Sequence, residues 1–509
     1  MRILVAIMLL LSLLLVPAGC GQTAEKDDDE LFMEKYETPE NLKQVPVKFV
    51  FPGTEPKNWN LVKKEIESRS ADEVNAILDF KWVEMQQYIQ EMSTLDASGE
   101  VIDAFCLGKP DSYLPDFVKL AREGKLKDIT TLFPENAPSL FSKFSQAELD
   151  YAKADGKIYA VPSMEPTAYC TYLMVDDALH KKYNIPEITT LDHYEQYLKA
   201  IKENEPDLIP GTIANVVNTM NLFARAFDYV IVDDVQKLVY KWNDPDMKLM
   251  AWEQTPEFLQ AVSKISSWQE KGYVKFHEAD QTKITSFIYY GALYPPSEET
   301  TTMTFSTSGG DFTESNPLRV FYLYPEKKVQ RDNSMGSFFF NGSFVFPSVS
   351  ANTERALRYL DWVHRSKENY YLVMYGIEGT DYVLNSGFPT FPEGMDYNSR
   401  SYMYWDGYWA FNSLEYAPEM PDAYGSGLNS QKEFLDKYSM YAPHGAFYPN
   451  YKTIQEAADK RKAAFMKFEM QLSMGEINDV SLVSDFIGNM KELGSDNLVA
   501  EVQKQMKGK

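Results

Sequence analysis

The pattern of hydrophobic and polar positions after residue 44 alternates between short apolar runs and amphipathic stretches. Helices and strands are predicted in the order strand 47–51, helix 59–78, strand 80–83, helix 85–95, strand 101–107 and helix 117–123. Asn58 is a possible N-cap of the first helix. This order predicts a parallel sheet whose ligand-facing loops follow the strand ends at residues 51–60 and 107–113.

Further along the chain, strands and helices continue to mix. Strands are predicted at residues 158–161, 169–175, 302–306, 319–324, 337–340 and 343–346. Helices are predicted at residues 177–183, 191–203, 256–271, 352–363, 369–375, 453–474, 481–494 and 497–506. The fold class is therefore α/β, with two to four domains or lobes expected from 509 residues.

The first 19 residues have the pattern of an export signal. Arg2 precedes an apolar run at residues 3–16, and Ala18-Gly19 supplies the small residues that a signal peptidase needs. A cysteine at position 20 resembles a lipoprotein signal, in which Cys20 is acylated, although Pro17 stands where that motif usually has Leu. The alternative is a plain secretory signal. The run is too short and one-sided for a stable transmembrane helix.

Residues 20–44 are predicted to form an acidic tether behind the lipid anchor. They contain many Asp and Glu and almost no aliphatic residues, a composition typical of solvated chain.

Charge and motif content narrow the function classes. The net charge of −24 argues against a nucleic-acid binder, because an acidic surface repels phosphate backbones. Aromatic residues reach 14%, more than core packing needs, and tyrosine suits half-wet binding surfaces. No hydrolase, zinc-protease, P-loop or EF-hand motif occurs, and the five histidines lack metal-ligand spacing. Cys106 and Cys170 lie in apolar runs and are expected to be buried free thiols rather than a disulfide.

Several segments occur in an order that resembles the family 1 extracellular solute-binding proteins, the sugar-type receptors of ABC importers. The most specific is Asp-Gly-Lys-Ile-Tyr-Ala-Val-Pro at 155–162. Tyr-Leu-Met-Val-Asp at 172–176, Gly-Ser-Phe-Val-Phe-Pro at 342–347 and Tyr-Gly-Ile-Glu-Gly-Thr-Asp-Tyr at 375–382 follow. The end of the chain, from Leu493, resembles a C-terminal extension of a lipoprotein branch in Gram-positive bacteria.

The resemblance implies a type II periplasmic-binding-protein-like fold. Each of its two lobes would be a mixed, mainly parallel sheet flanked by helices, with hinge strands between the lobes. Lobe one would comprise residues 45–163 plus 347–398, and lobe two residues 164–346 plus 399–509 with a C-terminal helical extension. The hinges would lie near 162–168, 343–348 and 395–402. No catalysis and no cofactor are implied.

Sugar receptors combine flat aromatic platforms with carboxylate and amide partners for hydroxyls. Six of ten residues at 402–411 are aromatic; in this run Trp405 is a candidate stacking platform and Asp406 a candidate hydroxyl acceptor. The alternative for this run is core packing around a turn at Asp406-Gly407. The remaining candidate ligand residues, each with a structural alternative, are Trp59, Asp103, Glu165, Tyr169, Ser308, Asn341, Glu378, Tyr382 and Trp409.

The leading interpretation is a monomeric, lipid-anchored receptor on the outer face of the cell membrane that captures an oligosaccharide and delivers it to the permease subunits of an ABC importer. One alternative is a secreted carbohydrate-active enzyme, a lyase or glycosidase, which would need an acid/base pair that the sequence does not single out. The other is a sensor or adhesion lipoprotein on the same fold.

Overall fold

The computed structural model describes residues 42–94, 101–108, 114–162, 164, 169–213, 216–275, 283–292, 306–307, 310–311, 318–324, 329–331, 343–413, 415–416, 437 and 439–508. Cys20, almost all of the predicted tether and the strand predicted at 337–340 lie outside these residues. The chain divides into residues 1–43 and a compact unit, Gln44–Lys509, which contains both lobes. Within the described ranges, no helix combines the length and the apolar character that crossing a bilayer requires.

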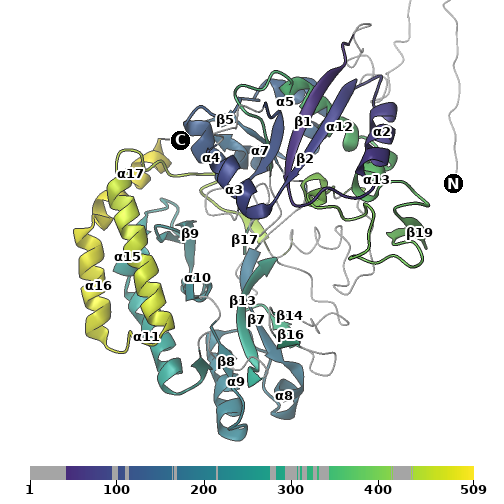
Figure 1. The fold of residues 1–509 in the computed structure, drawn as a ribbon. Coiled ribbons are helices and arrows are strands. Elements are labelled where there is room, and N and C mark those ends of the chain that lie inside the picture. Colours follow the sequence, from purple (N-terminus) through teal and green to yellow (C-terminus); the bar gives the residue numbers. More distant parts are fainter. Residues whose placement is uncertain are drawn as a thin grey trace, which may run out of the picture. The chain divides into compact units, whose positions relative to one another are not determined.

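The first lobe is built on a five-stranded sheet with the strand order β2-β1-β3-β18-β6. Its neighbouring strands β1 and β2 are labelled in Figure 1. β1 (Val45–Pro52) lies between β2 (Ala76–Val83) and β3 (Ala104–Leu107) and pairs in parallel with both. β18 (Ser343–Val345) and β6 (Ala160–Val161) complete the sheet with antiparallel pairings. The predicted parallel β-α-β-α-β unit is therefore correct, and a distant segment of the chain extends its sheet.

Helices border this sheet. They are α2 (Trp59–Arg69), α3 (Met85–Thr94), α4 (Phe117–Arg122), α5 (Leu132–Asn136), α6 (Pro138–Ser142), α7 (Gln146–Tyr151), α12 (Thr353–Val363) and α13 (Lys367–Tyr375). The helix predicted at 59–78 was too long, because residues from Ala76 onward pair with β1 as strand β2. Asn58 occupies the N-cap position of α2 but makes no side-chain cap.

Aromatic side chains dominate the core of lobe one. Phe49 and Phe51 of β1 pack against Phe80 of β2 at ring-centroid distances of 5.3 and 5.0 Å. The aromatic run joins the same core: Trp405 meets the Phe51 ring edge-on at 5.1 Å, and Phe411 lies 5.0 Å from Phe344. The third crossover expected near 395–402 therefore does not separate the two lobes, since residues 402–411 pack with lobe one.

The second lobe is built on another five-stranded sheet, with the order β12-β8-β13-β7-β16. Its strands are β7 (Tyr169–Asp176), β8 (Gly211–Thr212), β12 (Val274–Lys275), β13 (Ser286–Ala292) and β16 (Leu318–Phe321). The pairs β12–β8 and β8–β13 are parallel, whereas β7 pairs in the antiparallel sense with β13 and β16. This sheet, like that of lobe one, is thus evenly mixed rather than mainly parallel.

Helices and a small sheet complete lobe two. The helices are α8 (Asp177–Lys182), α9 (Leu191–Asn204), α10 (Val216–Ala226), η1 (Trp252–Gln254) and α11 (Pro256–Glu270). The small sheet has the order β11-β10-β9 and comprises β9 (Tyr229–Asp233), β10 (Leu238–Lys241) and β11 (Met250–Ala251). Short elements elsewhere in the unit are β4 (Lys153–Ala154), β5 (Lys157–Ile158), β14 (Ser306–Thr307), β15 (Gly310–Asp311), β17 (Val329–Arg331), β19 (Val383–Asn385), β20 (Phe388–Thr390), η3 (Tyr408–Phe411) and β21 (Ser439–Tyr441).

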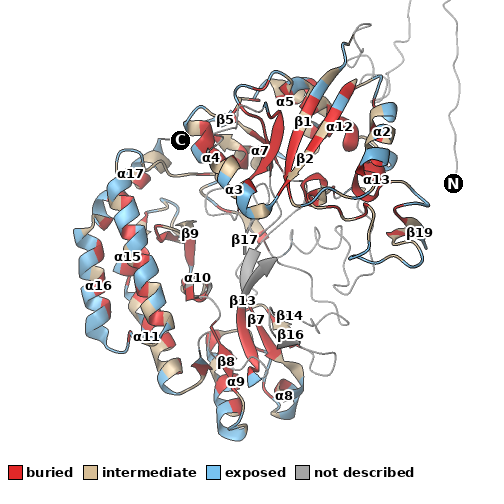
Figure 2. Ribbon diagram, viewed as in Figure 1, coloured by how far each residue is buried: buried red, intermediate tan, exposed pale blue. Residues whose placement is uncertain are grey.

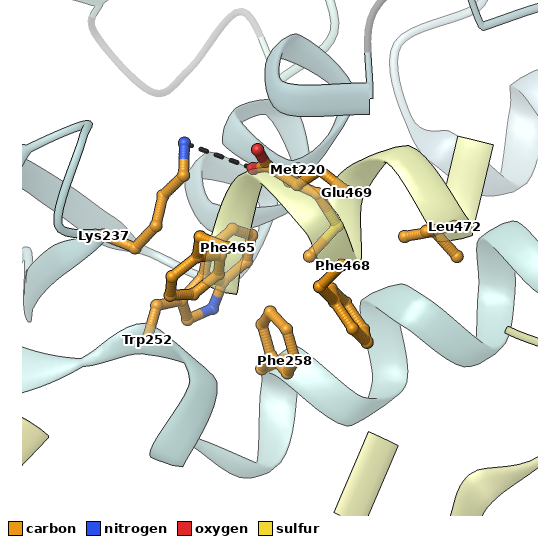
Figure 3. Close-up of a pocket in the computed structure, with 8 residues that line it drawn as sticks. All are labelled: Met220, Lys237, Trp252, Phe258, Phe465, Phe468, Glu469 and Leu472. Carbon is orange, nitrogen blue, oxygen red and sulfur yellow. Dashed lines mark ion pairs between the residues drawn. The ribbon is translucent and has the colours of Figure 1, made fainter. Parts of the chain in front are cut away.

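The last three helices, α15 (Gln455–Ser473), α16 (Val480–Glu492) and α17 (Ser495–Lys507), pack on lobe two. Their inner faces are buried and their outer faces exposed (Figure 2). Phe465, Phe468 and Phe486 from α15 and α16 belong to the same hydrophobic core as Phe258 of α11. Figure 3 shows Phe258, Phe465 and Phe468 together with Lys237, whose ammonium lies 3.5 Å from Glu469 Oε1 of α15. Burial raises the pKa of the Glu469 carboxyl, and the Lys237 charge partly offsets this.

A fully buried polar group, here called the C-terminal clamp, fastens these helices. It consists of Gln236, Glu253, Arg461 and Ser495. Arg461 of α15 donates from NH1 to Glu253 Oε1 at 2.7 Å and from NH2 to the Gln236 carbonyl at 3.1 Å. The Ser495 hydroxyl, at the start of α17, lies 2.8 Å from the same Glu253 oxygen. The clamp links α15, α17 and η1, so the C-terminal extension is an integral part of lobe two.

Candidate functional site

The parallel strands of lobe one end together at one edge of the sheet. Pro52, the last residue of β1, is in register with Val83, the last residue of β2. The loop that follows β1 begins with Gly53, whose N–H donates to the Val83 carbonyl at 2.7 Å. In open α/β sheets, ligands bind outside the carboxyl ends of parallel strands. This carboxyl edge is therefore where lobe one would meet a ligand.

Asp406 reaches this edge from the far end of the chain. Its Oδ2 accepts a hydrogen bond from the Thr54 N–H at 2.9 Å, across 352 positions of sequence. Gly53 has φ +121°, and a Cβ built on it would overlap the Asp406 side chain. Only glycine allows the two segments to approach this closely.

Arg400 holds the other oxygen of the same carboxylate. It donates from NH2 to Asp406 Oδ1 at 3.1 Å and from NH1 to the Tyr397 carbonyl at 2.6 Å. Its guanidinium carbon also lies 4.0 Å from the centre of the Tyr397 ring, a cation–π contact. The side chains of Arg400 and Asp406 are 21% and 35% exposed, so this ion pair is fixed on several sides but remains accessible to solvent.

Trp82, the penultimate residue of β2, lies beside Asp406. Its indole N–H donates to the Asp406 carbonyl at 2.7 Å. The rings of Trp59 and Trp405 meet it edge-on, at 5.4 and 5.8 Å, and leave the indole half-buried. The hydrogen bond and the two ring contacts fix its orientation. Sequence reasoning missed Trp82, although its place at the end of a predicted strand was a usable signal.

The turn that presents Asp406 has unusual backbone geometry. Gly407 has φ +106°, and a Cβ there would come within 3.0 Å of the rings of Phe51 and Trp405. Tyr404 has φ +57°, which is uncommon for a tyrosine. Residues in such regions persist where the surroundings fix them, and they cluster at functional sites.

Asp381 holds together the segments that form the carboxyl edge. This fully buried carboxylate accepts hydrogen bonds from Asn58 Nδ2 at 2.9 Å and from Ser401 Oγ at 2.6 Å. It also accepts from the Ile377 N–H at 2.9 Å. Asp381 thus connects the β1–α2 loop to the segment before Asp406, which gives the 375–382 motif a structural role. Within this motif, Glu378 is exposed and Tyr382 is buried.

The structure places the other predicted aromatic residues in the core. Trp59 stacks on Phe80 at 4.5 Å and is 4% exposed. Trp405 is 1% exposed and donates its N–H to the Val373 carbonyl at 2.9 Å. Trp409 is also buried, at 6% exposure. For these three, the placement corresponds to the packing alternative that the sequence left open.

Asp103 lies away from the carboxyl edge. It immediately precedes β3, at the amino end of that strand, and is 2% exposed. Its carboxylate accepts from the Lys48 N–H at 2.9 Å and from Ser350 Oγ at 2.7 Å. The expectation that Asp103 faces ligand is therefore corrected: it cross-links strands and the loop before α12.

The remaining candidates come from segments described little or not at all. Glu165, Ser308 and Asn341 lie outside the described residues, and for Tyr169 only the backbone, in β7, is described. Cys106 is buried and free, as predicted. Across the described ranges, no cluster of His, Cys, Asp and Glu has the arrangement of a metal site.

No protein-family model matches the chain. A carbohydrate ABC transporter substrate-binding protein of Streptococcus pneumoniae is 23% identical over 464 residues, which cover 89% of this chain and 88% of the relative. The crystal structure of the N-glycan transport solute-binding protein NgtS from Streptococcus pneumoniae matches with a TM-score of 0.66 at 17% identity, over 92% of this chain and 99% of that one. This chain has the two-lobe fold of the solute-binding proteins.

A further solute-binding protein supports the same assignment. The HMO-binding, ABC-transporter-associated protein from Bifidobacterium longum infantis matches with a TM-score of 0.61 at 15% identity, over 91% of this chain and 99% of that one. The predicted fold class and the resemblance to sugar-type solute-binding proteins are confirmed. All three relatives are named for transport or binding rather than for catalysis.

Proposed function

We propose that this protein is an extracytoplasmic solute-binding protein that captures an oligosaccharide and delivers it to an ABC importer. One observation carries the proposal: in a solute-binding fold, the half-buried indole of Trp82 is hydrogen-bonded to the backbone carbonyl of Asp406, and the side-chain carboxylate of that same residue is oriented at the carboxyl edge of lobe one by the Thr54 N–H. A sugar ring presents a weakly apolar C–H face and hydroxyl edges, and this pair offers one partner for each.

Binding would proceed by closure of the two lobes. A sugar ring stacks on Trp82, and a hydroxyl donates to a free lone pair of Asp406. Lobe two then contacts the opposite side of the ligand, so that ligand favours the closed arrangement. Glu165, Tyr169, Ser308 and Asn341 stay the proposed contacts on that side, and Glu378 and Tyr382 stay proposed contacts from lobe one.

The proposed location is the outer face of the cell membrane. Cys20 would carry the lipid, and residues 20–44 would form the tether, which is rich in Asp and Glu. The partners would be the oligosaccharide and the permease subunits of the importer. The similarity to a substrate-binding protein of an ABC transporter supports the extracytoplasmic location.

Thermal unfolding of the purified protein with and without glycans tests the proposal. The panel consists of maltotetraose and the two glycans seen bound to NgtS, Man1GlcNAc and Man5GlcNAc. A glycan at 100 times its dissociation constant stabilises the folded state by about 2.7 kcal/mol, which shifts the midpoint measurably.

The outcomes separate the functions. A shift with a glycan that mass spectrometry finds unchanged supports the receptor. Shortened glycan would instead establish the carbohydrate-active enzyme. No shift with any panel glycan, or with wider glycan mixtures, would contradict oligosaccharide capture and favour the sensor or adhesion role.

A further inference from the structure

The ion pair between Arg400 and Asp406 determines which chemical groups of a ligand can bind beside it. Each carboxylate oxygen of Asp406 accepts one described hydrogen bond, from Thr54 N–H or from Arg400 NH2. An ionised carboxylate has about four acceptor positions. Two therefore remain for a ligand, in a side chain that is 35% exposed. The group is oriented and offers only acceptors.

The positive charge of Arg400 is already committed at the same place. Its guanidinium is paired with Asp406, stacked on the exposed Tyr397 ring and bonded to the Tyr397 carbonyl. A ligand carboxylate at Trp82 would consequently meet the acceptor oxygens of Asp406 beside an arginine whose charge is compensated. The negative charges of the ligand carboxylate and of Asp406 would repel each other at hydrogen-bond distance, and an ionised ligand carboxylate has no proton to donate to Asp406.

From these contacts we propose that the Arg400–Asp406 pair is a specificity element: it admits neutral sugar rings at Trp82 and rejects rings that carry a carboxylate. This inference rests on the proposed function and narrows its substrate class to uncharged, hydroxyl-rich glycans at this position. Arg400 acts as a positioning residue, since it orients Asp406 and loses its own attraction for anions in doing so.

The test compares each panel glycan with its derivative in which the terminal C6 hydroxymethyl group is oxidised to a carboxylate. Dissociation constants are measured by calorimetry for the wild-type protein and for Asp406→Asn. The wild type should bind the neutral glycan at least about tenfold more tightly than the carboxylate derivative. Raising the salt concentration should reduce this discrimination, because both charged groups are solvent-accessible.

Asp406→Asn should act in opposite directions on the two ligands. The neutral glycan should bind about tenfold more weakly, because an ionic acceptor is lost. The carboxylate derivative should bind more tightly than to the wild type, because Arg400 is released as a forked anion partner. A merely structural role for Asp406 would weaken both ligands alike.

Asp128→Asn is the matched control. Asp128 is also 35% exposed, pairs with Lys157 at 2.8 Å and accepts from a backbone N–H, that of Thr130 at 3.0 Å, but takes no part in the carboxyl edge. This variant should keep the wild-type preference.

Each outcome decides a different question. Equal or tighter wild-type binding of the carboxylate derivative would overturn the specificity element while the receptor function stands. An unchanged preference in Asp406→Asn would also overturn it. If neither ligand form binds the wild type, the proposed function fails and this inference fails with it.

Discussion

Replacing Arg461 with methionine tests whether the C-terminal clamp holds lobe two together. The Arg461 and Glu253 side chains are both 0% exposed and are joined at 2.7 Å. Arg461→Met keeps most of the aliphatic volume but leaves the Glu253 carboxylate buried, with the Ser495 hydroxyl as its remaining hydrogen-bond partner among the described residues. Removing one member of a buried ion pair costs about 3–5 kcal/mol of unfolding free energy, so we expect a loss of this size.

Urea denaturation and hydrogen exchange should be measured together, because the two lobes have separate cores. Amides of α15 and α17 should exchange faster in Arg461→Met, while those of β1 and β2 should not change. The neighbouring variant Lys460→Met is the control, since Lys460 and its partner Glu456 are 59% and 84% exposed and such pairs contribute little.

The double variant Glu253→Gln, Arg461→Met sharpens the reasoning. Removing both charges should recover part of the stability that Arg461→Met loses, because no buried carboxylate remains without a cation. Equal stability of Arg461→Met and Lys460→Met would refute the argument. So would a double variant less stable than Arg461→Met by the full cost of Glu253→Gln, because the two sites would then be uncoupled.

Three further predictions concern lobe one. Trp82→Ala should abolish glycan binding measured by calorimetry and also lower the melting temperature, because the half-buried indole packs against Trp59 and Trp405, whereas Trp405→Phe should lower the melting temperature and keep binding; binding kept by Trp82→Ala and lost by Trp405→Phe would return Trp405 to the ligand. Burial raises the pKa of the Cys106 thiol well above its usual range, so a thiol reagent should label Cys106 only on unfolding; fast labelling in the native protein of the peptide that contains Cys106, located by mass spectrometry, would contradict its burial. Burial, with the Lys143 charge, lowers the pKa of His364 to about 3. Between about pH 6.5 and 3 the unfolded chain therefore binds a proton that the folded protein does not. The free energy of unfolding should consequently decrease as the pH is lowered through this range, by up to about 1.4 kcal/mol per pH unit. His364→Phe should show a shallower fall, and an unchanged slope would show that His364 is not buried as a neutral group.

Much of lobe one could be predicted because its local signals agree. The apolar runs of β1 and β3, the stops at Pro52-Gly53 and Gly108, and the spacing of α3 and α4 all correspond to the observed elements. Residues 76–78 were misassigned to a helix because a short apolar run does not distinguish helix from strand. Their pairing with Val45–Val47 makes them part of strand β2, and this contact joins segments about 30 residues apart in the sequence.

The site was harder to predict for the same reason. An aromatic run such as 402–411 looks the same in sequence whether its rings line a ligand site or fill a core. The sequence marked Asp406 as a candidate hydroxyl acceptor, and that role stays a prediction; its position at the carboxyl edge and its partners Thr54, Trp82 and Arg400 depend on tertiary contacts that the sequence does not show. The prediction for Asp103 was wrong because a carboxylate meets the ligand edge only when it lies at the carboxyl end of a strand. Residue type alone does not show at which end of the strand it lies.

The contact between Asp406 and the Gly53–Thr54 loop also constrains the order in which the chain can fold. A chain made from its N-terminus has β1, β2 and β3 available early, but β18 only after residue 345 and the ring of Phe411 only after 411 of the 509 residues. Until then the Phe51 and Phe80 rings lack their covering partners, and contacts of such long sequence separation close slowly. Lobe one therefore begins to fold first and completes its core late. The core of lobe one stays incompletely packed until the chain has reached Phe411.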